Sequence, residues 1–318
     1  MEQRALGRSG IDVSRVILGC GNFGGIGSSP AFFGAGESES EAHALLDAAW
    51  AAGITTFDTA DAYGGGRSEA YIGSWLRTKG SDVRDRLVLT TKTFNPMQEG
   101  ADSGLSAPRI RRQLESSLQR LGVESVELYL AHEADPATPL EETIGAFAEL
   151  QQEGKLRAFG GSNVDAPWLE EALQHGRIEW VQNSYSLLER GDEAGVLEVC
   201  AREGLGYTPF SPLAGGWLTG KYRRGQAPPE GSRMTLRPGP YEHLRTDRTF
   251  DGLEAFEEQA RERDTSPTTL ALAWALASPH VTAVVIGPRR PEQLQPAVDA
   301  LELDLSPPER ESMGALFA

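Results

Sequence analysis

Residues 126–162 read VELYLAHEADPATPLEETIGAFAELQQEGKLRAFGGS, and the pattern of this stretch decides the fold. It begins with a short apolar run at 126–131 and ends with a second one at 157–162. Between them, residues 140–153 place apolar side chains three and four positions apart, which is typical of an amphipathic helix. The stretch therefore predicts a strand–helix–strand unit with parallel strands and a right-handed crossover.

The same alternation runs through the chain. Further amphipathic stretches lie at residues 40–52, 108–121 and 193–203, and glycines follow several presumed helix ends, where a left-handed residue is favoured. The apolar runs predict eight strands, at residues 16–19, 54–59, 87–92, 126–131, 157–162, 180–183, 206–210 and 281–287. Eight βα units can close into a (β/α)₈ TIM barrel, so we predict this α/β fold, with a doubly wound open sheet as the alternative.

Two segments fall outside this repeat. Residues 3–13, with glycines at 7 and 10, predict a small hairpin ahead of the first strand, in a position to cover the barrel floor. Residues 222–249 are rich in Gly, Pro and Arg and follow the seventh strand, so we expect a long irregular loop at the ligand-binding face. No repeat or low-complexity tract divides residues 1–318, which predicts a single domain.

The composition restricts the classes of partner. With 46 acidic and 30 basic residues the formal net charge is −16, which would repel nucleic-acid phosphates and anionic lipid. No apolar stretch approaches bilayer length and no apolar segment marks a secretion signal, so we expect a cytoplasmic protein. The two cysteines, Cys20 and Cys200, are expected to be buried free thiols. A small-molecule substrate is expected, and a homo-oligomer is possible.

Residues 19–24, GCGNFG, follow the first strand and satisfy the G-x-G-x-x-G pattern of dinucleotide-binding loops. Such a loop should run directly into a helix, whereas residues 26–36 contain further glycines, a proline and the Phe32-Phe33 pair before helical periodicity begins. The glycines therefore indicate a loop that lines a site on a barrel.

Four titratable residues stand at or near successive strand ends: Asp58, Tyr63, Lys92 and His132. Taken singly, each could be a capping, core or solvated residue, but the strand ends of a barrel converge on one pocket. Reduction of a carbonyl requires hydride at carbon and a proton at oxygen, so a positioned weak acid is needed. A phenol serves if a neighbouring ammonium lowers its pKa toward neutrality.

In this arrangement Tyr63 is the acid and Lys92 the cation that tunes it. Asp58 is the natural ionic partner for a buried Lys92, and His132 could orient the substrate carbonyl. Asp58 and His132 could instead bind a metal, but too few ligands share a plausible spacing, so no metal is expected.

These residues lie in the motifs FDTADAYG at 57–64, TTK at 90–92 and LYLAH at 128–132. Through them the chain resembles the aldo-keto reductase superfamily from Arg4 to about Arg310, and within it the branch of aflatoxin-aldehyde reductases and potassium-channel β-subunits. The resemblance implies an NADPH-dependent oxidoreductase that reduces an aldehyde or ketone to an alcohol, with Tyr63 as general acid. A regulatory subunit that binds the nucleotide with little turnover is the second hypothesis.

The resemblance also implies where the cofactor binds. Ser162, Asn163 and Gln182 would hold the carboxamide, and Phe210 would stack on the nicotinamide ring. Residues 210–221, FSPLAGGWLTGK, resemble the loop that covers the pyrophosphate. The implied cofactor contacts are Gly21, Asn22, Ser162, Asn163, Gln182, Phe210, Ser211, Pro212, Leu213, Gly215, Lys221, Ile286, Gly287, Arg289 and Gln293.

The adenosine end is implied by residues 286–293, IGPRRPEQ, which resemble the segment that binds the 2′-phosphate. An arginine can bind phosphate through two parallel hydrogen bonds, so Arg289 favours NADPH. The family's usual acidic residue and Asn a few positions later are Pro296 and Ala297 here, which leaves NADH possible. Aromatic residues on the long loops, Phe23 and Trp217 among them, are expected either to shape the substrate pocket or to pack within their own loops.

Overall fold

The computed structural model describes residues 1–317, and its centre is a parallel sheet of eight strands. The spatial order is β10-β3-β4-β5-β6-β7-β8-β9, so neighbours in the chain are neighbours in the sheet. The strands are β3 (Val16–Gly19), β4 (Thr56–Asp58), β5 (Val88–Thr93), β6 (Val126–Ala131), β7 (Leu156–Ser162), β8 (Trp180–Gln182), β9 (Gly206–Tyr207) and β10 (Val284–Ile286). A doubly wound sheet would reverse its strand order at one point, and this order has no reversal.

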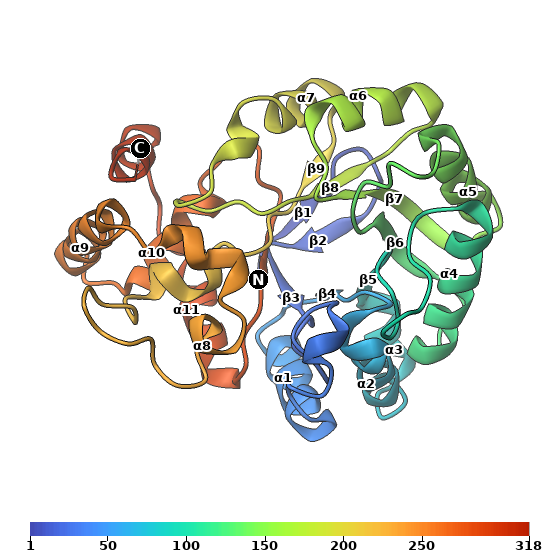
Figure 1. Cartoon of the computed structure of the whole chain (residues 1–318), viewed down its shortest axis with the longest axis horizontal. Helices are drawn as coiled ribbons and strands as arrows, with labels where there is room; N and C mark the ends of the chain where they lie inside the picture. The colour runs from blue at the N-terminus through green and yellow to red at the C-terminus, as the bar shows by residue number, and fades with distance from the viewer. Residues whose placement is uncertain (318) are drawn as a thin grey trace.

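The sheet closes on itself through the two ends of that series. The backbone N–H of Thr282 donates to the Tyr207 carbonyl over 2.8 Å, and that of Val285 donates to the Pro209 carbonyl over 2.8 Å. With these bonds the segment that contains β10 lies between β9 and β3. The predicted (β/α)₈ barrel is confirmed, and Figure 1 shows its strands surrounded by helices.

Side chains alternate across the barrel wall because successive strand residues point to opposite faces. In β3, Ile17 packs inside the barrel with Leu128, Leu130 and Trp180, whereas Val16 and Leu18 pack outward beneath the helices. The barrel interior is therefore a packed core rather than a channel. Polar residues that act on a ligand must lie above it, where the strands end.

The helices cover the outside of the barrel. They are α1 (Glu39–Ala51), α2 (Arg67–Leu76), α3 (Ser81–Arg86), α4 (Ala107–Leu121), α5 (Leu140–Gln152), α6 (Ala166–His175), α7 (Val196–Glu203), α8 (Arg233–Leu236), α9 (Asp247–Glu262), α10 (Pro267–Leu276), α11 (Gln295–Asp299) and α12 (Pro307–Ala315). The first begins at a capping box in which the Glu41 carboxylate accepts the Ser38 backbone N–H over 2.8 Å. None of the helices in residues 1–317 is long and apolar enough to cross a membrane.

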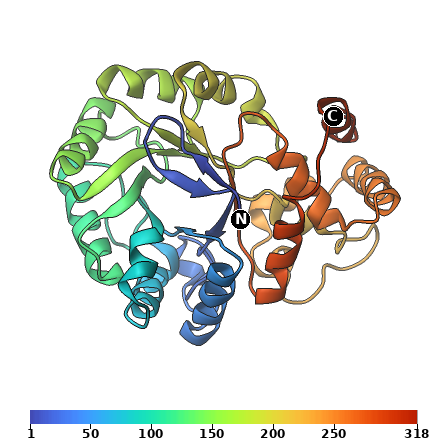
Figure 2. The ribbon, with the colours of Figure 1, turned by 180° about the vertical axis from the view of Figure 1, so that it is seen from behind.

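The predicted N-terminal hairpin is present as β1 (Gln3–Ala5) paired antiparallel with β2 (Asp12–Ser14). Leu6, Ile11 and Val13 are buried and join the cluster inside the barrel. Figure 2 shows the hairpin lying across the barrel opening on the side away from the view of Figure 1. The hairpin therefore closes the floor with apolar side chains. Both cysteines are buried and free, as predicted.

Residues 222–249, predicted to be irregular, contain two short helices, α8 and the 3-10 helix η5 (Gly239–Leu244). Helices of one or two turns, flanked by glycines and prolines, are too short to show a periodic pattern of apolar residues in the sequence. The segment packs on η4 (Ala214–Thr219), since the hydroxyl of Tyr222 donates to the Gly215 carbonyl over 3.1 Å. Residues 222–249 therefore cover the loop that follows β9.

Candidate active site

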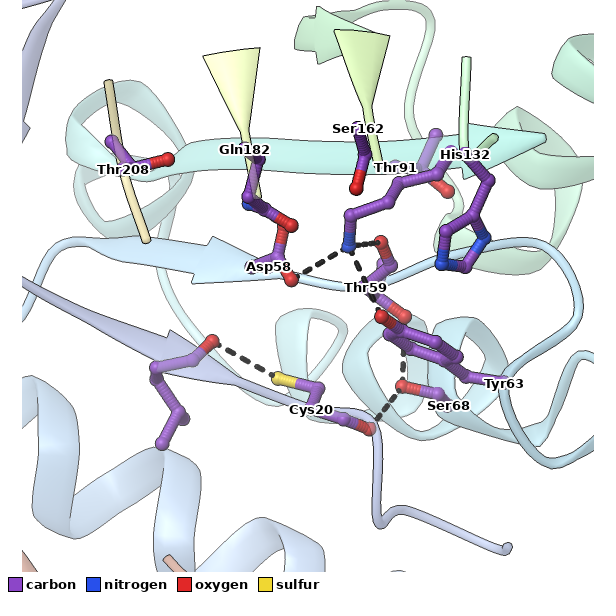
Figure 3. A network of polar contacts seen from close by, with 12 residues as sticks. Cys20, Asp58, Thr59, Tyr63, Ser68, Thr91, His132, Ser162, Gln182 and Thr208 are labelled. Carbon is purple, nitrogen blue, oxygen red and sulfur yellow. Dashed lines mark hydrogen bonds and ion pairs between the residues drawn. The ribbon is translucent and has the colours of Figure 1, made fainter. Parts of the chain in front are cut away.

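The centre of the site is the ammonium group of Lys92, which lies in β5 and is fully buried. Its Nζ donates to the Asp58 Oδ2 atom over 2.7 Å, to the Thr59 carbonyl over 2.9 Å and to the Tyr63 hydroxyl over 3.3 Å. Asp58 ends β4, and Tyr63 begins the 3-10 helix η2 (Tyr63–Gly65) just beyond it. Figure 3 shows Asp58, Tyr63 and His132 around this point.

The charges of this group follow from burial and contact. Burial lowers the pKa of Lys92, but the Asp58 carboxylate and the Tyr63 hydroxyl raise it by more, so the pKa lies above its ordinary value and the ammonium persists. Burial raises the pKa of Tyr63 and outweighs the opposing effect of Lys92. The expected net lowering of the phenol pKa is therefore wrong for the free protein, because desolvation of the phenolate dominates.

His132 directly follows β6 and completes the group. Its ring centroid lies 5.5 Å from that of Tyr63 in an edge-to-face arrangement. Burial and the Lys92 charge lower the pKa of His132 well below its ordinary value, so the imidazole is neutral. Within residues 1–317 its buried Nδ1 atom has no hydrogen-bond partner. A neutral ring with an unused nitrogen is suited to contact a polar ligand atom.

Hydrogen bonds fix the geometry around the ion pair. Gln182, at the end of β8, donates from Nε2 to the Asp58 Oδ1 atom over 3.0 Å and so orients the carboxylate. Ser68 donates to the Cys20 carbonyl over 2.9 Å and lies 2.8 Å from the Thr59 hydroxyl (Figure 3). Through Ser68, which lies on α2, the loops after β3 and β4 are thereby joined.

The residues expected at the carboxamide lie beside this group. Ser162 ends β7 and is buried, and Asn163 after it donates to the His132 carbonyl over 2.9 Å. Phe210 is half-buried and packs on top of the cluster inside the barrel. The ring of Phe210 and the polar ends of Ser162 and Gln182 thus share one rim of the barrel.

Strained backbone conformations also occur on the loops that follow β7 and β9. Among residues 1–317 four non-glycine residues have a positive φ, and three of them, Asn163, Ser211 and Ala214, lie on the predicted cofactor segments. The left-handed region costs a non-glycine residue free energy and is often retained where function requires it. The loops after β7 and β9 therefore carry backbone strain of a kind that is common at functional sites.

The loop predicted to cover the pyrophosphate folds into η4. Pro212 is buried, Leu213 and Gly215 are half-buried, and the Ser211 hydroxyl lies 2.8 Å from that of Tyr241 in η5. Gly215 has a φ of 63°, and a Cβ there would collide with the Tyr241 ring. The loop is therefore held under residues 222–249 by two tyrosine hydroxyls, those of Tyr222 and Tyr241.

A second cluster of polar residues contains three cations from three places in the sequence: Lys221, Arg233 and Arg289. Burial lowers the pKa of Lys221, and the charges of Arg233 and Arg289 lower it further. Burial also lowers the pKa of Arg233, and the charges of Arg237 and Arg289 add to that effect. Because like charges raise one another's free energy, such a cluster favours an anionic ligand.

Sequence reasoning missed Arg233, which lies in a segment predicted to be irregular. Its Nη2 atom donates to the Asn22 Oδ1 atom over 3.2 Å, which brings the loop after β3 to the cluster. Gly21 contacts the Tyr63 ring, since a Cβ at Gly21 would lie 3.5 Å from its Cε2 atom. The two residues expected in this loop thus lie near the phenol and the cations.

The segment after β10 forms a turn that is held together by the side-chain amide of Gln293. The Oε1 atom of Gln293 accepts the backbone N–H of Arg289 over 2.7 Å and that of Arg290 over 3.2 Å. Ile286 ends β10 and is buried, and Gly287 after it lies close to Asn22, whose Nδ2 atom would be 3.9 Å from a Cβ at Gly287. All the predicted cofactor residues therefore lie at the carboxyl ends of the strands or on the loops above them.

Two aromatic residues that were candidates for the substrate pocket are instead packed. Phe23 is 1% exposed, and Trp217 is 2% exposed with its ring centroid 5.0 Å from that of Tyr222. Their burial favours the packing alternative for both. Within residues 1–317, no three His, Cys, Asp or Glu side chains come together in a way that could hold a metal ion.

Comparison with known proteins shows the family of the chain. Residues 15–316 match the Aldo/keto reductase family. The uncharacterized oxidoreductase YrpG of Bacillus subtilis is 38% identical, over 96% of this chain and 92% of its own length. The NADH-specific methylglyoxal reductase of Escherichia coli is 33% identical, over 96% and 95%. A putative voltage-gated potassium channel subunit beta of Schizosaccharomyces pombe is 35% identical, over 94% and 88%. The chain belongs to the aldo/keto reductase family.

Proposed function

We propose that this protein reduces an aldehyde or ketone to an alcohol with NADPH, and that Tyr63 is the general acid. Its family and its relatives support an oxidoreductase that uses a nicotinamide cofactor. The observation that supports Tyr63 as the acid is the contact of one buried ammonium, Lys92 Nζ, with both the Asp58 carboxylate and the Tyr63 hydroxyl.

When bound, a nicotinamide cofactor would supply hydride to the carbonyl carbon. The Tyr63 hydroxyl then delivers its proton to the carbonyl oxygen, and its raised pKa keeps that proton in place beforehand. Lys92 stabilises the phenolate that remains, because its ammonium is 3.3 Å from that oxygen. The Asp58 carboxylate keeps Lys92 protonated through their ion pair. The neutral His132 ring orients the substrate carbonyl by a hydrogen bond.

The residues present fit such a cofactor. Ser162, Asn163 and Gln182 supply donors and acceptors for a carboxamide, and the half-buried Phe210 ring supplies a stacking surface. At the other end, the cations Lys221, Arg233 and Arg289 suit the phosphates. Arg289 supports NADPH in particular, since its guanidinium can form two parallel bonds to a 2′-phosphate.

The substitution Tyr63→Phe tests this function. It removes one oxygen, so binding of NADPH should change little while reduction of an aromatic aldehyde falls by about 10²–10⁴-fold. Tyr71→Phe is the matched control, because it makes the same chemical change at a tyrosine on α2 that is not part of the group around Lys92. This variant should retain full turnover. Unchanged turnover in Tyr63→Phe would exclude Tyr63 as the acid.

The wild-type protein gives a second outcome. Tight NADPH binding without NADPH oxidation, across a panel of aldehydes, ketones and keto-sugars, would favour a nucleotide-binding regulatory subunit instead. The similarity to a potassium channel subunit beta makes this panel necessary.

A further inference from the structure

Glu37 is a buried carboxylate in direct contact with Arg289. It lies ahead of α1, is only 4% exposed, and its Oε1 atom accepts the Arg289 Nε–H over 2.5 Å. The backbone of Glu37 is held from both sides, since its N–H donates to the Asn22 carbonyl and its carbonyl accepts the Gly24 N–H, each over 2.8 Å. The side chain is therefore anchored where it stands.

This ion pair occupies the guanidinium expected to bind the cofactor's 2′-phosphate. Besides the bond to Glu37, the Arg289 Nη1 atom donates to the Gly231 carbonyl over 3.1 Å. Two of the three guanidinium nitrogens thus have partners within the protein. A phosphate that needs two parallel N–H donors must displace at least one of these bonds.

The charge of Glu37 adds a second obstacle. A 2′-phosphate carries nearly two negative charges, and like charges in a poorly solvated place repel strongly. A ribose 2′-hydroxyl is neutral and can donate to a carboxylate, as in dinucleotide sites where an acidic residue selects the unphosphorylated cofactor. Within residues 1–317 the buried Oε2 atom of Glu37 has no hydrogen-bond partner, so an acceptor is available.

We propose that Glu37 is a specificity-determining residue that holds the Arg289 guanidinium and weakens binding of a 2′-phosphate relative to a 2′-hydroxyl. Glu37 then reduces the preference for NADPH over NADH that Arg289 alone would give. This inference rests on the proposed function, because it assumes that the adenosine end of a nicotinamide cofactor lies at Arg289.

The test is a binding measurement that needs no turnover. Quenching of tryptophan fluorescence gives Kd for NADP⁺ and NAD⁺ with the wild type and with Glu37→Gln. The variant keeps the side-chain shape and removes the charge, so Kd for NADP⁺ should fall about tenfold while Kd for NAD⁺ changes less than about threefold. The measured quantity is the ratio of the two constants, which cancels effects common to both nucleotides.

Glu41→Gln is the matched control. Glu41 lies on the same segment but is exposed, and glutamine can still serve in its capping box with Ser38. Its ratio of constants should shift much less than in Glu37→Gln, because Glu41 does not touch Arg289 and solvent screens an exposed charge. If Glu37→Gln does not fold, Glu37→Ala retains the backbone bonds to Asn22 and Gly24 and should shift the ratio in the same direction.

The outcomes separate the two proposals. Binding of both nucleotides with an unchanged ratio in the folded Glu37 variant overturns the role of Glu37 alone. Equal weakening of both nucleotides also overturns it, since that result marks a structural role. Failure of the wild type to bind either nucleotide would instead contradict the proposed function.

Discussion

The Lys92 ammonium lies 2.7 Å from the Asp58 carboxylate, and the two side chains are 0% and 4% exposed. A charge pair at such depth is stable only while both partners are present, because removal of one leaves the other desolvated and unpaired. The same ammonium contacts the Tyr63 hydroxyl, so one atom joins the buried ion pair to the proposed acid.

Lys92→Met should therefore lower both activity and stability. We expect kcat to fall by about 10²–10³-fold through loss of phenolate stabilisation. The free energy of unfolding should fall by about 3–5 kcal/mol because Asp58 is left unpaired. Steady-state kinetics and urea unfolding measure the two effects.

The double variant Asp58→Asn, Lys92→Met separates these effects. It removes both charges, so part of the stability should return while kcat stays low. A Lys92→Met protein with wild-type kcat would contradict the role given to the ammonium.

His132 should remain neutral across the physiological pH range. Burial and Lys92 hold its pKa well below its ordinary value, so lowering the pH from 8 to about 5.5 should not protonate it. The ring resonance, assigned by comparison with His132→Asn, should show no titration in an NMR series over that range. A midpoint near 6.5 would show that the ring is more solvated than the structure indicates.

Asp61 should make stability fall as the pH rises. Burial first, and then the Glu69 charge, raise the pKa of Asp61 to about 7 in the folded protein. The folded state thus keeps a proton that the unfolded chain loses near its ordinary pKa of about 4, so stability declines between those two values.

Asp61→Asn tests that dependence, because its amide oxygen can still accept the hydrogen bond from Thr93. Between about pH 5 and pH 7 the melting temperature of the variant should depend less on pH than that of the wild type. Parallel curves for the two proteins would show that Asp61 does not titrate in this range.

Two glycines should respond oppositely to alanine. At Gly160 in β7 a Cβ would overlap the Trp180 carbonyl of β8, so Gly160→Ala should cost about 3 kcal/mol or more. Gly145 lies within α5, and a Cβ there would meet no atom outside the local helix backbone within 4 Å, so Gly145→Ala should gain about 0.5–1 kcal/mol. Thermal unfolding of both variants measures the difference, and a stable Gly160→Ala protein would contradict the close approach of the strands.

Local sequence patterns were sufficient for most of the barrel. The strand predicted at 126–131 begins and ends where β6 does, and the helix predicted at 140–153 ends one residue beyond α5. The seventh strand is shorter than predicted, with β9 ending at Tyr207, although the N–H groups of Thr208 and Phe210 still donate to the carbonyls of Val181 and Asn183, each over 3.0 Å. The short helix α8 was missed because one helical turn carries no measurable periodicity.

The sequence by itself determined the parallel barrel, and it placed Asp58, Lys92 and His132 at or next to the ends of strands. Both follow from the alternation of apolar runs and amphipathic stretches, which is visible within short segments of the chain. Only the tertiary structure decided the contacts between distant segments. Glu37 and Arg289 are 252 positions apart, and their contact depends on how the loops after β3 and β10 pack. The net pKa of Tyr63 likewise depends on burial, which outweighs its contact with Lys92 and becomes known only once the chain has folded.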